Sequence, residues 1–71
     1  MDKKKQAFLK KLGERIVAIR EAKGLTQTQL AEKCDKDKQS VNRLEKGNVN
    51  PSVYYLQQVA EALEVSLYEI L

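Results

Sequence analysis

Two short helical patterns separated by three polar residues lie within residues 27–46, and this arrangement constrains the fold more than any other feature of the chain. Leu30 and Ala31 mark the inward face of the first pattern, and Val41 and Leu44 mark that of the second. Two helices joined by so short a turn cross steeply, and the crossing requires a small side chain, which Ala31 provides. Because such a pair cannot bury a core of its own, flanking helices must pack against it.

Residues with capping and turn-forming side chains lie at the ends of both patterns. Thr26 and Gln29 have the spacing of a capping box, which predicts the start of the first short helix. Asp35 is suited to the left-handed backbone of a tight turn, and Asp37 is suited to cap the next helix. Gly47 is expected to end that helix.

A longer amphipathic helix is predicted before this pair, from about Lys5 to Lys23, and Gly24 is expected to end it. Its apolar residues recur at spacings of three and four, as one face of a helix requires. These residues are Phe8, Leu9, Leu12, Ile16 and Ile19.

A fourth helix is predicted after Pro51, with Ser52 as its cap. Its expected buried residues are Val53, Leu56, Val59, Ala60 and Leu63. Ser66 and Glu69 have the spacing that begins a fifth helix. Since no alternating strand pattern and no repeat appears, the sequence predicts an all-α fold of five helices joined by short turns.

The composition excludes several classes of function. A chain of 71 residues allows one small domain, residues 1–71, and no separate catalytic pocket. The absence of His and the single Cys34, which we expect to be buried at the end of the second helix, exclude a disulfide, a zinc cluster and histidine catalysis. With no phosphate-binding glycine loop and no convergent carboxylates, we expect no enzyme activity, no cofactor and no metal.

The charge is distributed unevenly along the chain. Residues 1–23 carry eight Lys or Arg and three acidic residues, residues 24–50 carry five and four, and residues 51–71 carry none and three. A polyanion such as nucleic acid is therefore expected to contact the first two thirds of the chain. Ordinary solvated surface charge accounts for this single fact equally well. No secretory signal or membrane-spanning stretch appears, so we expect a cytoplasmic protein.

In their order and spacing, these residues resemble the phage repressor and Cro-like domains of the XRE family, over about Leu12 to Leu71. The segments that carry the resemblance are Leu12-Gly13 through Arg20, Lys23-Gly24-Leu25-Thr26-Gln27, Leu30-Ala31-Glu32-Lys33, Arg43-Leu44-Glu45-Lys46-Gly47, Asn50-Pro51-Ser52, and Leu56 through Ala60 to Leu63. Two residues depart from the family pattern, Asp35 in place of Gly and Lys36 in place of an apolar residue. Asp tolerates the left-handed region, and Lys36 either snorkels or leaves the turn less well anchored.

The resemblance implies a five-helix lambda-repressor-like DNA-binding domain whose helix-turn-helix unit is residues 27–46. It also implies that the third helix lies in the major groove of double-stranded DNA. The candidate base contacts are Lys38, Gln39, Ser40, Asn42 and Arg43. Arg43 lies a turn further along and could equally hold a phosphate. For each residue, the alternative is an exposed polar side chain without a partner.

Phosphate contacts are expected at the start of the second helix, where free amide groups and the helix dipole favour an anion. With the flanking polar residues, the candidates are Lys23, Thr26, Gln27, Thr28, Lys46 and Asn48. Gln27 resembles the family glutamine that touches phosphate and braces the recognition helix. A run of basic residues near the start either forms an arm along the DNA or a frayed, solvated terminus, and we expect the second; these are Lys3, Lys4, Lys5, Lys10 and Lys11.

Arg20 and Glu45 match positions that pair between the first and third helices in this family, which implies a structural ion pair. One short helix reads few base pairs, so we expect a homodimer on a pseudo-palindromic operator. The expected dimer surface is the cation-free C-terminal third, including Tyr54, Tyr55, Tyr68, Ile70 and Leu71. Some of these residues complete the monomer core instead, with Leu67 and Ile70 the first candidates.

The predicted function is sequence-specific DNA binding by a transcriptional regulator, either a repressor or a small controller-type protein, located at the nucleoid. The alternative is a protein-interaction module such as an antitoxin of the same fold, whose main partner is another protein. The sequence leaves the operator, the sign of regulation, any inducer and the extent of the full protein open.

Overall fold

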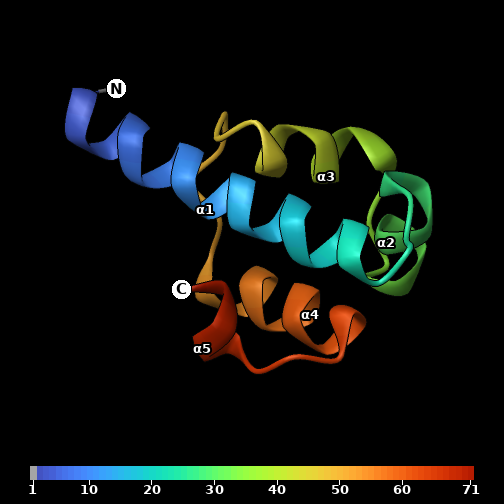
Figure 1. The fold of residues 1–71 in the computed structure, drawn as a ribbon. Coiled ribbons are helices and arrows are strands. Elements are labelled where there is room, and N and C mark those ends of the chain that lie inside the picture. Colours follow the sequence, from blue (N-terminus) through green and yellow to red (C-terminus); the bar gives the residue numbers. More distant parts are fainter. Residues whose placement is uncertain (1) are drawn as a thin grey trace.

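The computed structural model describes residues 2–71, and this part of the chain contains five helices and no strand (Figure 1). The helices are α1 (Lys3–Ala22), α2 (Gln27–Lys33), α3 (Lys38–Glu45), α4 (Val53–Leu63) and α5 (Leu67–Ile70). The predicted all-α architecture of five helices is therefore confirmed.

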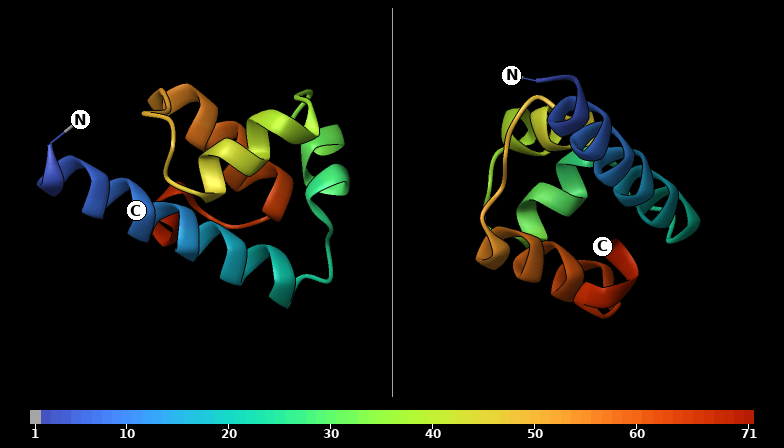
Figure 2. Two further views of the ribbon diagram at one scale, coloured as in Figure 1. Left: turned by 90° about the horizontal axis from the view of Figure 1, so that it is seen from above. Right: turned by 90° about the vertical axis from the view of Figure 1, so that its left-hand side faces the viewer.

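In the view of Figure 1, α3 lies above the long helix α1, and α4 and α5 lie below it. Helix α1 contacts α3 and α5, while α2 contacts both α3 and α4. In the end-on view α4 and α5 lie on the opposite side of the bundle from α3 (Figure 2). The pair α2 and α3 is thus held by the flanking helices, as its inability to bury a core requires.

The helices begin where capping side chains satisfy free backbone N–H groups. Asp2 accepts a hydrogen bond from the Lys5 amide at 2.7 Å, so α1 begins at Lys3 and not at about Lys5. Thr26 and Gln29 form the predicted capping box, with bonds of 3.1 and 2.8 Å. These local bonds determine where α1 and α2 start.

The later helix starts follow the same chemistry with one exception. The Asp37 carboxylate accepts from the Ser40 amide at 2.7 Å, and the Ser52 hydroxyl accepts from the Tyr55 amide at 3.0 Å. Ser66 precedes α5 but makes no side-chain capping bond. The capping predictions for α3 and α4 are confirmed, whereas Ser66 marks the start of α5 by position alone.

One continuous core joins all five helices. Its buried hydrophobic residues are Leu9, Leu12, Ile16, Leu30, Ala31, Cys34, Val41, Leu44, Leu56, Val59, Ala60, Leu63 and Ile70. Ile70 is fully buried and Leu67 packs against the core, so both belong to the monomer interior. The prediction that Cys34 is buried is also confirmed.

Two residues predicted on buried faces are exposed. Phe8 is 61% exposed, because it lies at the rim of α1 beside Leu71, where no other helix covers it. Val53 is 70% exposed, because it occupies the first position of α4, a turn before Leu56 reaches the core. Both residues therefore lie on the apolar face of their helix, but no neighbouring helix covers them.

The turn between α2 and α3 explains both departures from the family pattern. Asp35 adopts the left-handed conformation with φ of 58°, as predicted. The Lys36 ammonium lies 5.0 Å from the centre of the Tyr55 ring, within the range of a cation–π interaction. Lys36 therefore contacts α4 through its charge, at the position where the resemblance led us to expect an apolar side chain.

Candidate nucleic-acid interface

The outward face of α3 is polar and open. Lys38, Gln39 and Arg43 are exposed, and with Asn42 they line one surface hollow. Within residues 2–71, no hydrogen bond or ion pair engages the side chains of Lys38, Gln39 or Arg43. The buried residue Val41 lies on the opposite face of α3, so packing aims these three polar side chains outward.

The other two candidate base-contacting residues are engaged inside the protein. The Ser40 hydroxyl lies 2.8 Å from the Tyr55 hydroxyl, which ties α3 to α4. Burial raises the pKa of Tyr55, and the bond to Ser40 only partly offsets this effect. The side-chain amide of Asn42 donates to the side-chain oxygen of Gln27, Oε1, at 3.3 Å. Both side chains are half-buried, so they face the interface less freely than the three exposed residues.

A buried ion pair joins α1 to α3. Arg20 donates to both oxygens of Glu45, through Nε at 2.7 Å and through Nη2 at 3.2 Å. Its third nitrogen, Nη1, donates to the Leu25 carbonyl at 2.7 Å and so holds the loop before α2. The side chains of Arg20 and Glu45 are only 11% and 3% exposed. Gln27 completes the arrangement by donating to Glu45 Oε1 at 2.8 Å.

The start of α2 lies next to the start of α3. Thr26, Gln27 and Thr28 line a hollow together with Lys38 and the loop that follows α1. Lys23 is exposed at the C-terminal cap of α1, shortly before this hollow. One set of the candidate phosphate-binding residues therefore gathers at the N-terminal end of α3.

A second group of basic residues gathers at the other end of α3. Lys46 and Asn48 line a hollow together with Lys3 and Lys10 from the first turns of α1. The expectation of a frayed terminus is wrong for all five lysines near the start, because Asp2 caps α1 and the helix is formed from Lys3, although their side chains are solvated as expected. The capping position of Asp2 was the sequence signal for this extension.

The remaining side of the molecule has the opposite charge. Helices α4 and α5 contain Glu61 and Glu69 and no Lys or Arg. They lie on the far side of the bundle from α3 (Figure 2). The basic side chains of α3 and the acidic side chains of α4 and α5 therefore lie on different sides of the bundle.

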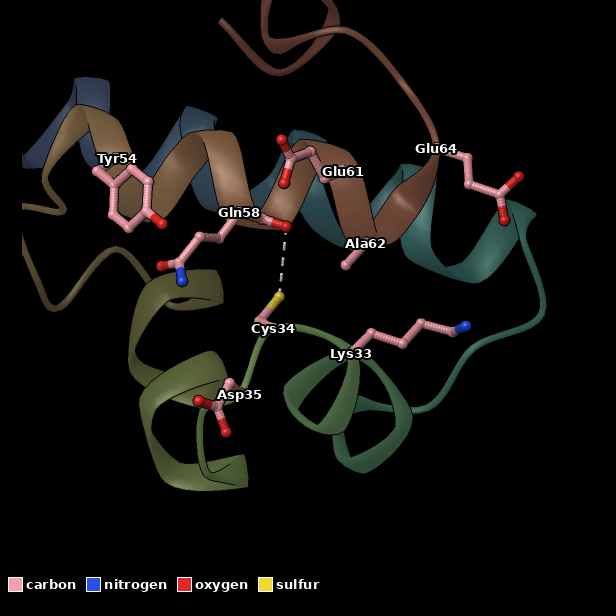
Figure 3. Close-up of a pocket in the computed structure, with 8 residues that line it drawn as sticks. All are labelled: Lys33, Cys34, Asp35, Tyr54, Gln58, Glu61, Ala62 and Glu64. Carbon is pink, nitrogen blue, oxygen red and sulfur yellow. Dashed lines mark hydrogen bonds between the residues drawn. The ribbon is translucent and has the colours of Figure 1, made fainter.

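A further hollow lies between the end of α2 and helix α4 (Figure 3). Within it the Cys34 thiol donates to the backbone carbonyl oxygen of Gln58, with 3.8 Å between sulfur and oxygen. Burial raises the pKa of Cys34, against a smaller opposing effect of Lys36. A buried thiol with a raised pKa is a poor nucleophile, so this hollow lacks the features of a reactive-cysteine site.

The fold and the polar face of α3 together define a class, the helical DNA-binding domains built on a helix-turn-helix. The chain belongs to the helix-turn-helix family HTH_3, which matches residues 16–70. The resemblance to the XRE-type domains is thereby confirmed. The relatives described below are named as an immunity repressor, a transcriptional regulator and a restriction-modification controller protein, which agrees with the prediction that the chain is not an enzyme.

Two relatives are longer proteins than this chain, and both are named as regulators. The immunity repressor protein of Bacillus phage phi105 is 41% identical over 59 residues, covering 83% of this chain and 41% of the repressor. The HTH-type transcriptional regulator SinR of Bacillus subtilis (strain 168) is 34% identical over 61 residues, covering 84% of this chain and 55% of SinR. The chain spans about half the length of these two relatives.

A solved structure of similar size is the restriction-modification controller protein C.AhdI from Aeromonas hydrophila. It is 35% identical to this chain, with a TM-score of 0.90, and the match covers 92% of this chain and 98% of the controller protein. Between residues 2 and 71, the helices are all too short or too polar to cross a membrane.

Proposed function

We propose that the chain is a transcriptional regulator, a repressor or a small controller-type protein, that binds operator DNA with α3 in the major groove. The observation that carries this proposal is the outward face of α3. There Lys38, Gln39 and Arg43 are exposed and free of partners among residues 2–71. A helix whose polar face has no internal partners is suited to base edges. The names of the phage repressor, of SinR and of the controller protein support the same role.

The base contacts follow from the chemistry of each side chain on α3. Lys38 and Arg43 are suited to donate to guanine O6 and N7, with phosphate as the alternative partner for Arg43, and Gln39 is suited to a bidentate contact with adenine. Ser40 and Asn42 each retain hydrogen-bonding capacity beyond their internal bonds, and they add further contacts.

Phosphate contacts at both ends of α3 complete the interface. Thr26, Gln27 and Thr28, with Lys23 nearby, lie at one end. Lys46 and Asn48 lie at the other. Contacts on both sides of a groove set the position of the helix within it, while the bases set specificity. Replacing Lys46 by Ala is expected to weaken binding to all sequences by a similar factor.

We propose that residues 1–71 act as one helix-turn-helix domain and that two copies bind a pseudo-palindromic operator at the nucleoid, within the cytoplasm. The dimer surface is the C-terminal third, where Tyr54, Tyr68 and Leu71 are exposed. Exposed aromatic and apolar side chains on the side of the bundle away from α3 are available for a partner subunit and stay clear of the DNA.

Selection from random duplex DNA followed by sequencing tests this function, at about 150 mM salt to suppress purely electrostatic binding. The expected result is an enriched palindrome that is lost in the variant carrying Lys38→Ala and Gln39→Ala. Glu14→Ala, at an exposed position of α1, is the matched control, and it should retain the palindrome. No enrichment by the folded wild-type protein would contradict the proposal and favour the protein-partner role.

A further inference from the structure

Three polar side chains form a continuous path from the protein interior to the outward face of α3. Glu45 lies at the buried end, Gln27 bridges, and Asn42 lies at the surface end. Gln27 Nε2 is 2.8 Å from Glu45 Oε1, and Asn42 Nδ2 is 3.3 Å from Gln27 Oε1. Glu45 and Asn42 both lie on α3, and Gln27, the first residue of α2, connects them.

The charge of Glu45 determines the direction of every bond in this path. An ionised carboxylate only accepts hydrogen bonds, and both oxygens of Glu45 already accept from Arg20. Gln27 must therefore present its NH₂ group to Glu45, which leaves its carbonyl oxygen facing Asn42. Asn42 must in turn present its NH₂ group, because two carbonyl oxygens would repel each other.

The orientation of Asn42 decides what it offers to DNA. One N–H of its amide is used by Gln27, which leaves the Oδ1 acceptor and a second N–H donor. Asn42 lines the same surface hollow as Lys38, Gln39 and Arg43. In the major groove, adenine presents an N6 donor next to an N7 acceptor, which is the complement of one acceptor beside one donor.

We infer that Gln27 is a specificity-positioning residue. Glu45 sets the orientation of the Gln27 amide, and Gln27 in turn sets the orientation of the Asn42 amide, so that Asn42 selects adenine at one position of each half-site. This inference rests on the proposed function and names the class of operator that the interface prefers. It differs from the phosphate role of Gln27, because a phosphate contact strengthens binding to every sequence alike.

A double-mutant cycle on Gln27 and Asn42 tests the inference. Wild type, Gln27→Met, Asn42→Ala and the double variant are compared, first by selection from random DNA and then by affinity for sites carrying each base at the position that depends on Asn42. The wild type should prefer adenine there by roughly tenfold, the effect of one good bidentate contact. Each single variant should lose most of that preference, and the double variant should lose no more than Asn42→Ala.

A second variant covers the possibility that Gln27→Met fails to fold. Gln27→Lys retains a donor for Glu45 but has no acceptor for Asn42, so it should also lose the adenine preference while the ion pair is kept. Glu14→Met, at an exposed position of α1, is the matched control and should leave base preference unchanged. Circular dichroism establishes that each variant is folded.

Two results overturn the inference while leaving the proposed function intact. One is a uniform loss of affinity in Gln27→Met with the base preference unchanged, which would restrict Gln27 to phosphate contact and bracing. The other is a preference for a different base at the position that depends on Asn42. Failure of the wild type to enrich any motif would instead contradict the proposed function, and the inference with it.

Discussion

At the scale of single residues, Glu45 and Arg20 each take part in three side-chain hydrogen bonds. Glu45 accepts from Arg20 twice and from Gln27 once, and its side chain is 3% exposed. A buried charge with three donors is stabilising only as long as all of them remain in place.

Replacing Glu45 by Gln is expected to lower the free energy of unfolding by about 3 kcal/mol, because the buried Arg20 charge loses its counterion. Urea unfolding measures the change, and DNA binding should fall with it. The matched control is Glu61→Gln, which alters an exposed carboxylate bonded only to Gln57 and should change stability by less than about 0.5 kcal/mol. Equal stability of Glu45→Gln and wild type would contradict a structural role for the pair.

Cys34 makes stability depend on alkaline pH. Burial raises the pKa of its thiol from the ordinary value of 9.0, so the folded state holds the proton more tightly than the unfolded state. The stabilising contribution is full below pH 9 and is lost as the pH rises through the folded-state pKa.

The urea midpoint of the wild type is therefore expected to fall between neutral pH and about pH 10.5. In Cys34→Ala the midpoint should be lower at neutral pH but should change less with pH. The remaining dependence should come from Tyr55, whose pKa burial also raises from 10.0. Identical pH dependence in the variant and the wild type would assign the whole effect to Tyr55.

At the scale of helices and turns, two glycines end helices with the same backbone but different surroundings. Gly24 follows α1 with φ of 73° and has nothing within 4 Å of the place where a β-carbon would be. Gly47 follows α3 with φ of 74°, and a β-carbon there would be 2.8 Å from the backbone of Lys10. A substitution at Gly24 therefore measures the cost of backbone strain alone. A substitution at Gly47 adds the cost of the close approach of α1 to the end of α3.

Gly24→Ala is expected to cost about 1 kcal/mol from the left-handed backbone alone. Gly47→Ala should cost about 3 kcal/mol, because overpacking against rigid backbone adds to the strain. Urea unfolding of the two variants side by side checks the difference. Equal losses would mean that α1 moves away from Gly47 at little cost.

The contact between α1 and α3 also depends on Gly13 in the middle of α1. A β-carbon at this position would collide with the carbonyl groups of Leu44 and Glu45. Periodicity alone identified the apolar face of α1 but gave no reason for a glycine within it. The reason is tertiary, since only the packed pair of helices places the end of α3 against this point.

At the scale of the whole molecule, basic residues far apart in the sequence meet at one end of α3. Lys3 and Lys10 line the same hollow as Lys46. If they contact phosphates, the double variant Lys3→Ala, Lys10→Ala should lower the slope of log affinity against log salt by about 2. Titration of operator DNA at several salt concentrations measures the slope. An unchanged slope would leave these lysines outside the DNA footprint.

The proposed dimer surface belongs to the same scale. Tyr68 is 89% exposed, so Tyr68→Glu should leave monomer stability unchanged while weakening self-association. Sedimentation velocity measures the oligomeric state, and affinity for the full palindrome should fall more than affinity for a half-site. Tyr68→Phe is the matched control and should behave as wild type. A dimer that persists in Tyr68→Glu would exclude this residue from the interface.

The features that could be predicted from the sequence are those that depend on neighbours along the chain. Capping by Thr26, Asp37 and Ser52 and the left-handed turn at Asp35 were predictable because each involves bonds or strain within a few residues. The number of helices and most of the core followed from periodicity. The pairing of Arg20 with Glu45 was suggested by family resemblance, since the two residues are remote in sequence.

Which predicted faces are covered, and which polar groups are hydrogen-bonded, depends instead on how the helices pack together. Phe8 and Val53 have the right periodicity but no covering helix, so they stay exposed. Ser40 and Asn42 have the chemistry of base-contacting residues, yet each is bonded to a residue on another helix. Hydrogen bonding and burial between distant segments depend on how the helices pack, and local sequence contains no record of that geometry.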